Sequence, residues 1–173
     1  MTPRHRNLTA SVAICAALAA LSACNSDSAP REHTTGQVTA AARTYISAWL
    51  HRPSQPKTMC TLETKAARPN ADDGGDLAGC IRTYEDYFKD QQPSSADLTI
   101  TISHVQDVPA TGTRPAGKGA LATVREDGVE PFRYALRLVQ QDGRWRIAQR
   151  AEADESRYAH TEDPVADVLE RTA

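Results

Sequence analysis

The sequence predicts an α+β fold in which N-terminal helices pack on one curved antiparallel sheet. Two observations lead to this fold class. Apolar residues recur at helical spacing between Val38 and Leu50, and after Pro93 the period changes to the alternation of strands. Asp142-Gly143, between two alternating segments, is a strong signal for a tight hairpin. Helices followed by a run of strands favour helices segregated to one face of the sheet.

A long amphipathic helix is expected to follow Gly36. Its apolar residues lie three or four apart and form one stripe: Val38, Ala42, Tyr45, Ile46, Trp49 and Leu50. Thr35 is the expected N-cap, and Pro53 ends the helix.

Residues 57–92 carry Cys60 and Cys80 on either side of a polar, glycine-rich loop. We expect a weak first helix around Met59 and Leu62. A better second helix is predicted by the apolar spacing of Leu77, Ile81, Tyr84 and Phe88.

Four strands are expected after Pro93: "LTITIS", "KGALATVRE", "FRYALRLVQ" and "RWRIAQRAE". A two-residue turn at Asp142-Gly143 pairs Leu138 with Ile147 and Tyr134 with Ala151, which places the apolar residues of both strands on one face. Gln149 falls on that face opposite Leu136, either as a buried polar partner or as a strand-end residue that reaches solvent.

The opposite face of this hairpin is expected to carry five arginines. They define a candidate anion-binding face of Arg133, Arg137, Arg144, Arg146 and Arg150. An anionic envelope polymer or a lipid headgroup is one expected partner. A solvated strand face is the simpler interpretation and the one favoured here.

The N-terminus has the pattern of a secretory signal peptide. Arg4 and Arg6 precede an uncharged stretch from Leu8 to Leu21, whose 14 residues make about 21 Å of helix. This is shorter than the roughly 30 Å hydrocarbon core of a bilayer. A basic start, a short apolar stretch and small residues are typical of an export signal.

"LSAC", Leu21 to Cys24, resembles the lipobox of bacterial lipoproteins, including those of actinobacteria. The resemblance implies that Cys24 receives a diacylglyceryl group and acyl chains such as palmitate, and that the signal is cut just before it. Two or more acyl chains give stable anchoring. The expected location is therefore the extracytoplasmic face of the cell membrane, with the covalent lipid on Cys24 as the membrane contact.

The predicted domain organisation follows from these signals. Residues 1–23 are the signal peptide, 24–35 a flexible tether, 36–155 the folded domain and 156–173 a loose C-terminal tail, in which Asp163-Pro164 could cap a short helix. The mature chain has 18 basic and 22 acidic residues, which offers no global attraction to nucleic acid.

Of the four cysteines, the signal peptide removes Cys15 and lipidation uses Cys24. Cys60 and Cys80 remain, and an exported compartment permits their oxidation, so a structural disulfide is expected. The alternative, two free thiols or a redox pair, lacks the CxxC spacing that tunes a reactive thiol.

The order and length of the elements resemble secreted NTF2-like (cystatin-like) lipoproteins. "AARTYISAWL", the pair "MC…GC" and the closing "LRLVQQDGRWRIAQ" carry this resemblance. It implies a cone with its cavity between the helices and the concave face of the sheet. The pocket would then be lined by Tyr45, Trp49, Tyr84, Phe88, Tyr134, Leu136, Trp145 and Gln149.

No catalytic or metal-ligating pattern is predicted, and no cofactor is expected. Acidic residues cluster in loops, and no acid falls on the apolar face of the strands. Ser103 and His104 are neighbours on a strand and are expected to point apart, which argues against a catalytic triad there. In "NADDGGD", aligning Gly75 with the EF-hand glycine places Ile81 where a glutamate is needed.

The predicted function is a lipid-anchored, non-catalytic binding or assembly module at the cell envelope. Its expected partners are an envelope protein or an anionic polymer, and NTF2-like sheets often form homodimers. The alternative is a pocket protein for an apolar small molecule, either a carrier or an NTF2-like isomerase or hydrolase.

Overall fold

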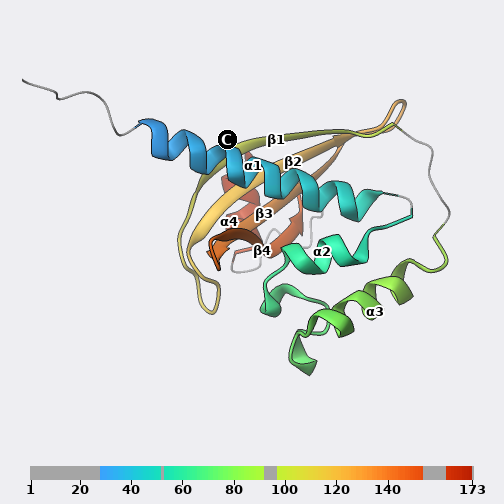
Figure 1. Cartoon of the computed structure of the whole chain (residues 1–173). Helices are drawn as coiled ribbons and strands as arrows, with labels where there is room; N and C mark the ends of the chain where they lie inside the picture. The colour runs from blue at the N-terminus through green and yellow to red at the C-terminus, as the bar shows by residue number, and fades with distance from the viewer. Residues whose placement is uncertain (1–27, 52, 92–96, 154–162, 173) are drawn as a thin grey trace, which may run out of the picture.

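The computed structural model describes residues 28–51, 53–91, 97–153 and 163–172 and shows an α+β fold (Figure 1). Three α-helices and two short 3₁₀ turns precede an antiparallel sheet, and one short helix follows it. The elements are α1 (Ser28–Leu50), α2 (Pro56–Leu62), η1 (Lys65–Ala67), η2 (Ala71–Asp73), α3 (Leu77–Phe88), β1 (Thr99–Val108), β2 (Gly117–Arg125), β3 (Phe132–Gln141), β4 (Arg144–Glu152) and α4 (Val165–Thr172). No helix in these ranges is long and apolar enough to cross a membrane.

Helix α1 lies across the sheet and buries the predicted stripe. Val38, Ala42 and Ile46 are fully buried, and Tyr45 is buried with them. The helix begins at Ser28, so residues 28–35 are helical, and the prediction of a tether there was wrong. Pro30 lies in the first turn, where the missing N–H has no intrahelical partner to lose. Residues 1–27, which include the predicted signal peptide and Cys24, lie outside the described residues.

Helices α2 and α3 pack against each other and are joined by a disulfide between Cys60 and Cys80, whose Cα atoms are 5.9 Å apart. The disulfide confirms the predicted pairing. Both cysteines are fully buried. Closing a loop of 20 residues stabilises the fold by about 3 kcal/mol in the chain-entropy account. Asp76 caps α3 by accepting a 2.8 Å hydrogen bond from the N–H of Gly79.

The sheet has the order β1-β2-β3-β4, with every neighbouring pair antiparallel. Its two faces are covered by different parts of the chain. Helix α1 covers one face, with α2 beside β4 and α3 packed on α2, and buried residues of these helices form the main core with Ala122, Val124, Leu136, Leu138 and Ile147. Helix α4 covers part of the other face, where Val165 and Leu169 pack against residues from all four strands.

The β3–β4 hairpin begins in the predicted register and then departs from it. Gln140 pairs with Trp145 and Leu138 with Ile147, as expected. A bulge at Ala148 then shifts the pairing, so that Arg137 faces Gln149 and Leu136 faces Arg150. The predicted pairing of Tyr134 with Ala151 was therefore wrong by one residue. Because a one-residue slip exchanges the faces of a strand, Gln149 lies on the α4 face and Arg150 on the face covered by α1.

Residues 163–172 are docked on the sheet, so this part of the predicted tail (156–173) is not loose, and residues 156–162 lie outside the described residues. Asp163 and Pro164 are buried, and the Asp163 carboxylate accepts a hydrogen bond from the N–H of Ala166. Residues Val165 to Glu170 have positive φ angles of 43–54°, so α4 turns in the left-handed sense. That conformation costs about 1–2 kcal/mol per L-residue, which burial of Val165 and Leu169 offsets in part.

Candidate functional site

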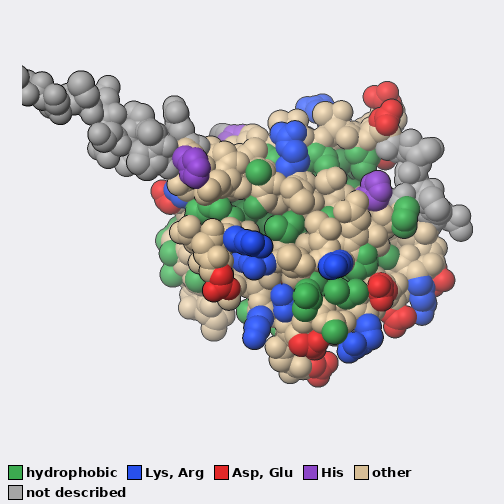
Figure 2. Space-filling view, viewed as in Figure 1, with side chains coloured by type: hydrophobic (Ala, Val, Ile, Leu, Met, Phe, Trp, Pro, Cys, Tyr) green, Lys and Arg blue, Asp and Glu red, His purple; other side chains and the backbone are tan. Residues whose placement is uncertain are grey.

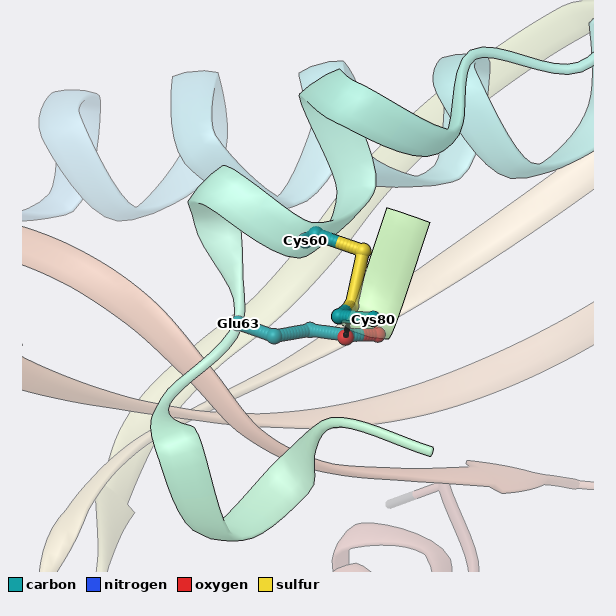
Figure 3. A group of neighbouring side chains, drawn as sticks. All are labelled: Cys60, Glu63 and Cys80. Carbon is teal, nitrogen blue, oxygen red and sulfur yellow. Dashed lines mark hydrogen bonds between the residues drawn. A yellow bond between two sulfur atoms is a disulfide. The ribbon is translucent and has the colours of Figure 1, made fainter. Parts of the chain in front are cut away.

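A buried carboxyl group, that of Glu63, lies at the centre of the helical layer beside the disulfide (Figure 3). Glu63 directly follows α2, and its N–H still bonds to Met59 O at 3.0 Å. Its own backbone is extended and forms a parallel bridge to Ile147 of β4. This position turns the side chain inward, and only 3% of the residue is exposed.

Two tyrosine hydroxyls donate to the same oxygen of this carboxyl group. Tyr84 reaches Glu63 Oε1 at 2.6 Å, and Tyr45 reaches it at 2.7 Å. Tyr45 comes from α1 and Tyr84 from α3, so the carboxyl group joins three helical segments. The other oxygen, Oε2, lies 3.8 Å from Cys80 Sγ. A disulfide sulfur carries no hydrogen, so this last approach is a packing contact.

Burial dominates the titration of this cluster. It raises the pKa of Glu63 above its usual value, and the hydrogen bonds from Tyr84 and Tyr45 and the charges of Arg150 and Arg68 oppose the rise. Burial also raises the pKa of Tyr45 and of Tyr84, and the neighbouring carboxyl group of Glu63 raises both further. Both tyrosines are therefore neutral donors at physiological pH.

Cys60, Glu63 and Cys80 place their potential ligand atoms within 4.8 Å of one another. This spacing is close enough for a metal ion in principle. Metal binding by cysteine requires thiolates, and both sulfur atoms are bonded to each other. The oxidised protein therefore offers a metal no more than the Glu63 carboxylate at this point.

Most of the predicted pocket residues do lie together, but as packed core. Trp49 meets Tyr84 with ring centroids 5.9 Å apart and Phe88 at 5.3 Å, both edge to face. Leu136 is fully buried, and Tyr134 and Trp145 pack against the same cluster. The structure separates Gln149 from this group. Its amide donates to Asp163 O at 2.9 Å on the opposite face of the sheet.

The five arginines of the candidate anion-binding face do not share one exposed surface. Arg137 is fully buried and donates to Pro109 O at 2.8 Å, to Pro115 O at 2.6 Å and to the Asp163 carboxylate. Arg150 turns to the helical side, where its Cζ lies 3.4 Å from the centroid of the Trp49 ring. Of the five, Arg144 is exposed, and Arg133 and Arg146 are partly exposed.

A groove of about 460 Å³ opens where the β1–β2 hairpin approaches the start of β4. Its lining is mostly apolar, and one ion pair, Lys118 Nζ to Asp107 Oδ1 at 2.7 Å, belongs to it. The lining residues are Asp107, Val108, Pro109, Ala116, Gly117, Lys118 and Trp145. The groove therefore overlaps the predicted pocket at Trp145.

Ser103 and His104 do not point apart as predicted. Strand β1 has a bulge between Ser103 and Gln106, and His104 has a φ of 52°, which brings Ser103 Oγ within 2.9 Å of His104 Nδ1. The imidazole is exposed on this edge strand. A catalytic serine–histidine pair also needs a third group that orients the base and hydrogen-bond donors for an oxyanion, so this contact by itself does not define an active site.

Glu63 is not among the predicted site residues. The prediction considered acids on the apolar face of the strands, whereas Glu63 lies just past the end of a short helix. One signal was present in the sequence. Glu63 follows Cys60 by three residues. Residues three apart in a helical turn lie on the same side, so Glu63 is expected on the side where Cys60 forms its disulfide.

No family model, curated protein or solved structure matches this chain.

Proposed function

We propose that this chain is a lipid-anchored, extracytoplasmic binding domain without catalytic activity, built on an NTF2-like architecture. The location rests on the sequence "LSAC" at the end of a short apolar stretch, because lipidation of Cys24 would hold the domain at the membrane. A buried disulfide between Cys60 and Cys80 supports an oxidising compartment outside the cytoplasm.

The observation that carries the non-catalytic role is the closure of the Glu63 cluster. A general acid or base has to come within hydrogen-bond reach of its substrate. The Glu63 carboxyl group is enclosed by two buried tyrosines and by the disulfide, and both donors are directed at the same oxygen. These contacts describe a group that ties three helical segments together.

The NTF2-like assignment is supported by the arrangement of the layers. The N-terminal helices lie on one side of a single antiparallel sheet, with α1 against the strands and α3 packed on α2, and the closing hairpin supplies Leu136, Leu138 and Ile147 to the core. The described side chains at this interface are buried against one another in one apolar cluster, which favours binding at the outer surface over an internal reaction chamber.

The experiment is to replace Cys24 with serine in the full-length chain and to follow the protein in cell fractions of a bacterial host. We expect the Cys24→Ser protein in the medium and the parent protein in the membrane. Cys15→Ser is the matched control, because it changes a cysteine that the signal peptide removes, and this variant stays in the membrane. A Cys24→Ser protein that loses its signal and remains in the membrane would overturn the anchor.

The second candidate function is a pocket protein for an apolar small molecule. The groove lined by Val108, Gly117 and Trp145 favours it, because its volume of about 460 Å³ lies in the range of about 300–1,000 Å³ that ligand sites occupy.

A further inference from the structure

We propose that Cys60, Cys80 and Glu63 bind a zinc ion when the disulfide between the two cysteines is reduced, so that the metal replaces the disulfide as the link between α2 and α3. This inference goes beyond the proposed binding role and does not depend on it. Three observations carry it: the spacing of the ligand atoms, a buried carboxyl oxygen without a donor, and the charge of the cluster.

The ligand atoms lie close to the spacing of a tetrahedral zinc site. Zinc binds thiolate sulfur at about 2.3 Å and carboxylate oxygen at about 2.0–2.2 Å, so two sulfur ligands lie about 3.8 Å apart, and a sulfur and an oxygen about 3.6 Å. Glu63 Oε2 lies 3.8 Å from Cys80 Sγ, and all three ligand atoms are within 4.8 Å of one another. The Cα atoms of Cys60 and Cys80 are 5.9 Å apart, so rotation of the two side chains can separate the sulfur atoms to the required distance.

One oxygen of the Glu63 carboxyl group has no hydrogen-bond donor among the described residues. The hydroxyls of Tyr45 and Tyr84 both donate to Oε1, whereas Oε2 faces Cys80 Sγ, and the side chain extends toward the disulfide (Figure 3). Only 3% of Glu63 is exposed, and a buried polar atom without a partner costs free energy. A zinc ion would bind this oxygen, while the two tyrosines orient the carboxyl group as outer-shell partners do in zinc sites.

The exchange of disulfide for zinc leaves the buried charge unchanged. A zinc ion bound to two thiolates is neutral, as is the disulfide that it replaces, so the Glu63 carboxylate alone sets the net charge of the site. Two arginines offset this charge. Arg68 Nε donates to the backbone carbonyl of Cys60 at 3.1 Å, and the charges of Arg68 and Arg150 both act on the Glu63 carboxyl group. Magnesium and calcium prefer oxygen ligands, so the two thiolates select zinc.

The exchange requires a reductant, for which we propose a dithiol. Exchange with a dithiol gives two cysteine thiols and converts the reductant to its own disulfide, so two electrons and two protons pass to the cysteines. Zinc then displaces the two thiol protons, and any proton on Glu63, into solvent. Cys60 and Cys80 are fully buried in the folded domain, so the ion binds while the reduced chain folds, as structural zinc does, and needs no channel from the surface.

The test uses the full chain with Cys15→Ser and Cys24→Ser, in which Cys60 and Cys80 are the remaining cysteines. The protein is reduced in urea with a phosphine, separated from the reductant and refolded without oxygen in the presence of Co²⁺, the spectroscopic probe for a zinc site. We expect a thiolate-to-cobalt charge-transfer band and the intense visible bands of tetrahedral cobalt, which saturate at one cobalt per chain. Zn²⁺ should remove these bands by displacing cobalt, and the oxidised protein should show none.

A ligand variant and a matched control complete the test. Glu63→Gln keeps an acceptor for the two tyrosines but removes the anionic ligand. It should weaken zinc binding at least about tenfold, since loss of an outer-shell partner alone weakens metal binding about 10–100-fold. Glu85→Gln changes an exposed glutamate on α3 and should bind zinc as the parent does. Circular dichroism of the oxidised variants checks that both fold.

Two results would overturn the proposal. One is a reduced parent protein that shows no charge-transfer band with cobalt, a measurement that tests the site even if a variant does not fold. The other is an equal zinc affinity of the Glu63→Gln and Glu85→Gln proteins, which would exclude the carboxyl group as a ligand. Thermal unfolding gives an independent measure, because zinc that binds the folded state should raise the midpoint of the reduced parent protein and leave that of the oxidised protein unchanged.

Discussion

The Tyr84 hydroxyl donates a 2.6 Å hydrogen bond to the buried carboxyl group of Glu63, across 21 residues of sequence. Tyr45 donates to the same oxygen. The carboxyl group thus provides the acceptor for two buried hydroxyls from different helices. Beside it, Cys60 and Cys80 join α2 to α3 covalently. One small polar cluster therefore connects the three N-terminal helices.

The first prediction follows from the shared acceptor. Glu63→Gln keeps a carbonyl oxygen at the position of Oε1, so both tyrosines retain an acceptor, and the free energy of unfolding should change by less than about 1 kcal/mol. Glu63→Ala leaves two buried hydroxyls unpaired and opens a cavity, and should destabilise the domain by about 3–5 kcal/mol. Urea unfolding followed by circular dichroism measures both. Equal losses in the two variants would contradict this account.

The pH dependence of stability gives a second prediction. Burial raises the pKa of Glu63 above its ordinary value of 4.5, so the folded state holds this proton more tightly than the unfolded state does. The stabilising contribution is complete below that value and is lost as pH rises through the folded pKa. Glu63→Gln should therefore remove part of the decline in stability above pH 4.5. The midpoint of urea unfolding, measured for both proteins across this pH range, tests this prediction. If the midpoints of the two proteins change with pH in parallel, the prediction is wrong.

Arg137 supports a third prediction. Its fully buried guanidinium joins β3 to the β1–β2 hairpin through Pro109 O and Pro115 O, and to Asp163 before α4. Arg137→Ala leaves the Asp163 carboxylate without its cation and should cost about 3–5 kcal/mol. Arg144→Ala, in the exposed turn of the same hairpin, should stay within about 0.5 kcal/mol. Thermal unfolding compares the two, and similar shifts would show that Arg137 makes no special contribution.

The helices and strands could be predicted because the apolar residues in each recur at the spacing typical of that element. The stripe from Val38 to Leu50 has the spacing of a helix, and the strands after Pro93 alternate apolar and polar residues. The Asp142-Gly143 turn fixed the first pairs of the closing hairpin. Cys60 and Cys80 were paired by elimination within an exported chain, which required no knowledge of the fold.

The faces of Gln149 and Arg150 could not be predicted in the same way. They depend on the bulge at Ala148, and no glycine or proline marks that position. One unpaired residue exchanged the environments of both side chains. Glu63 was missed for a related reason. Its burial is decided by how three helices meet, a tertiary fact with no local pattern in the sequence.

The last prediction concerns the handedness of α4. Asp167 is exposed in this helix and has a φ of 43°. Replacing it with glycine or with alanine removes the same side-chain interactions, so the difference between the two variants reports the backbone alone. Glycine adopts positive φ freely, and alanine does not, so Asp167→Gly should be more stable than Asp167→Ala by about 1 kcal/mol. In a right-handed helix the order reverses by a similar amount, because glycine is the weaker helix former. The difference in the free energy of unfolding between the two proteins, measured by chemical denaturation, therefore shows whether α4 is left-handed or right-handed.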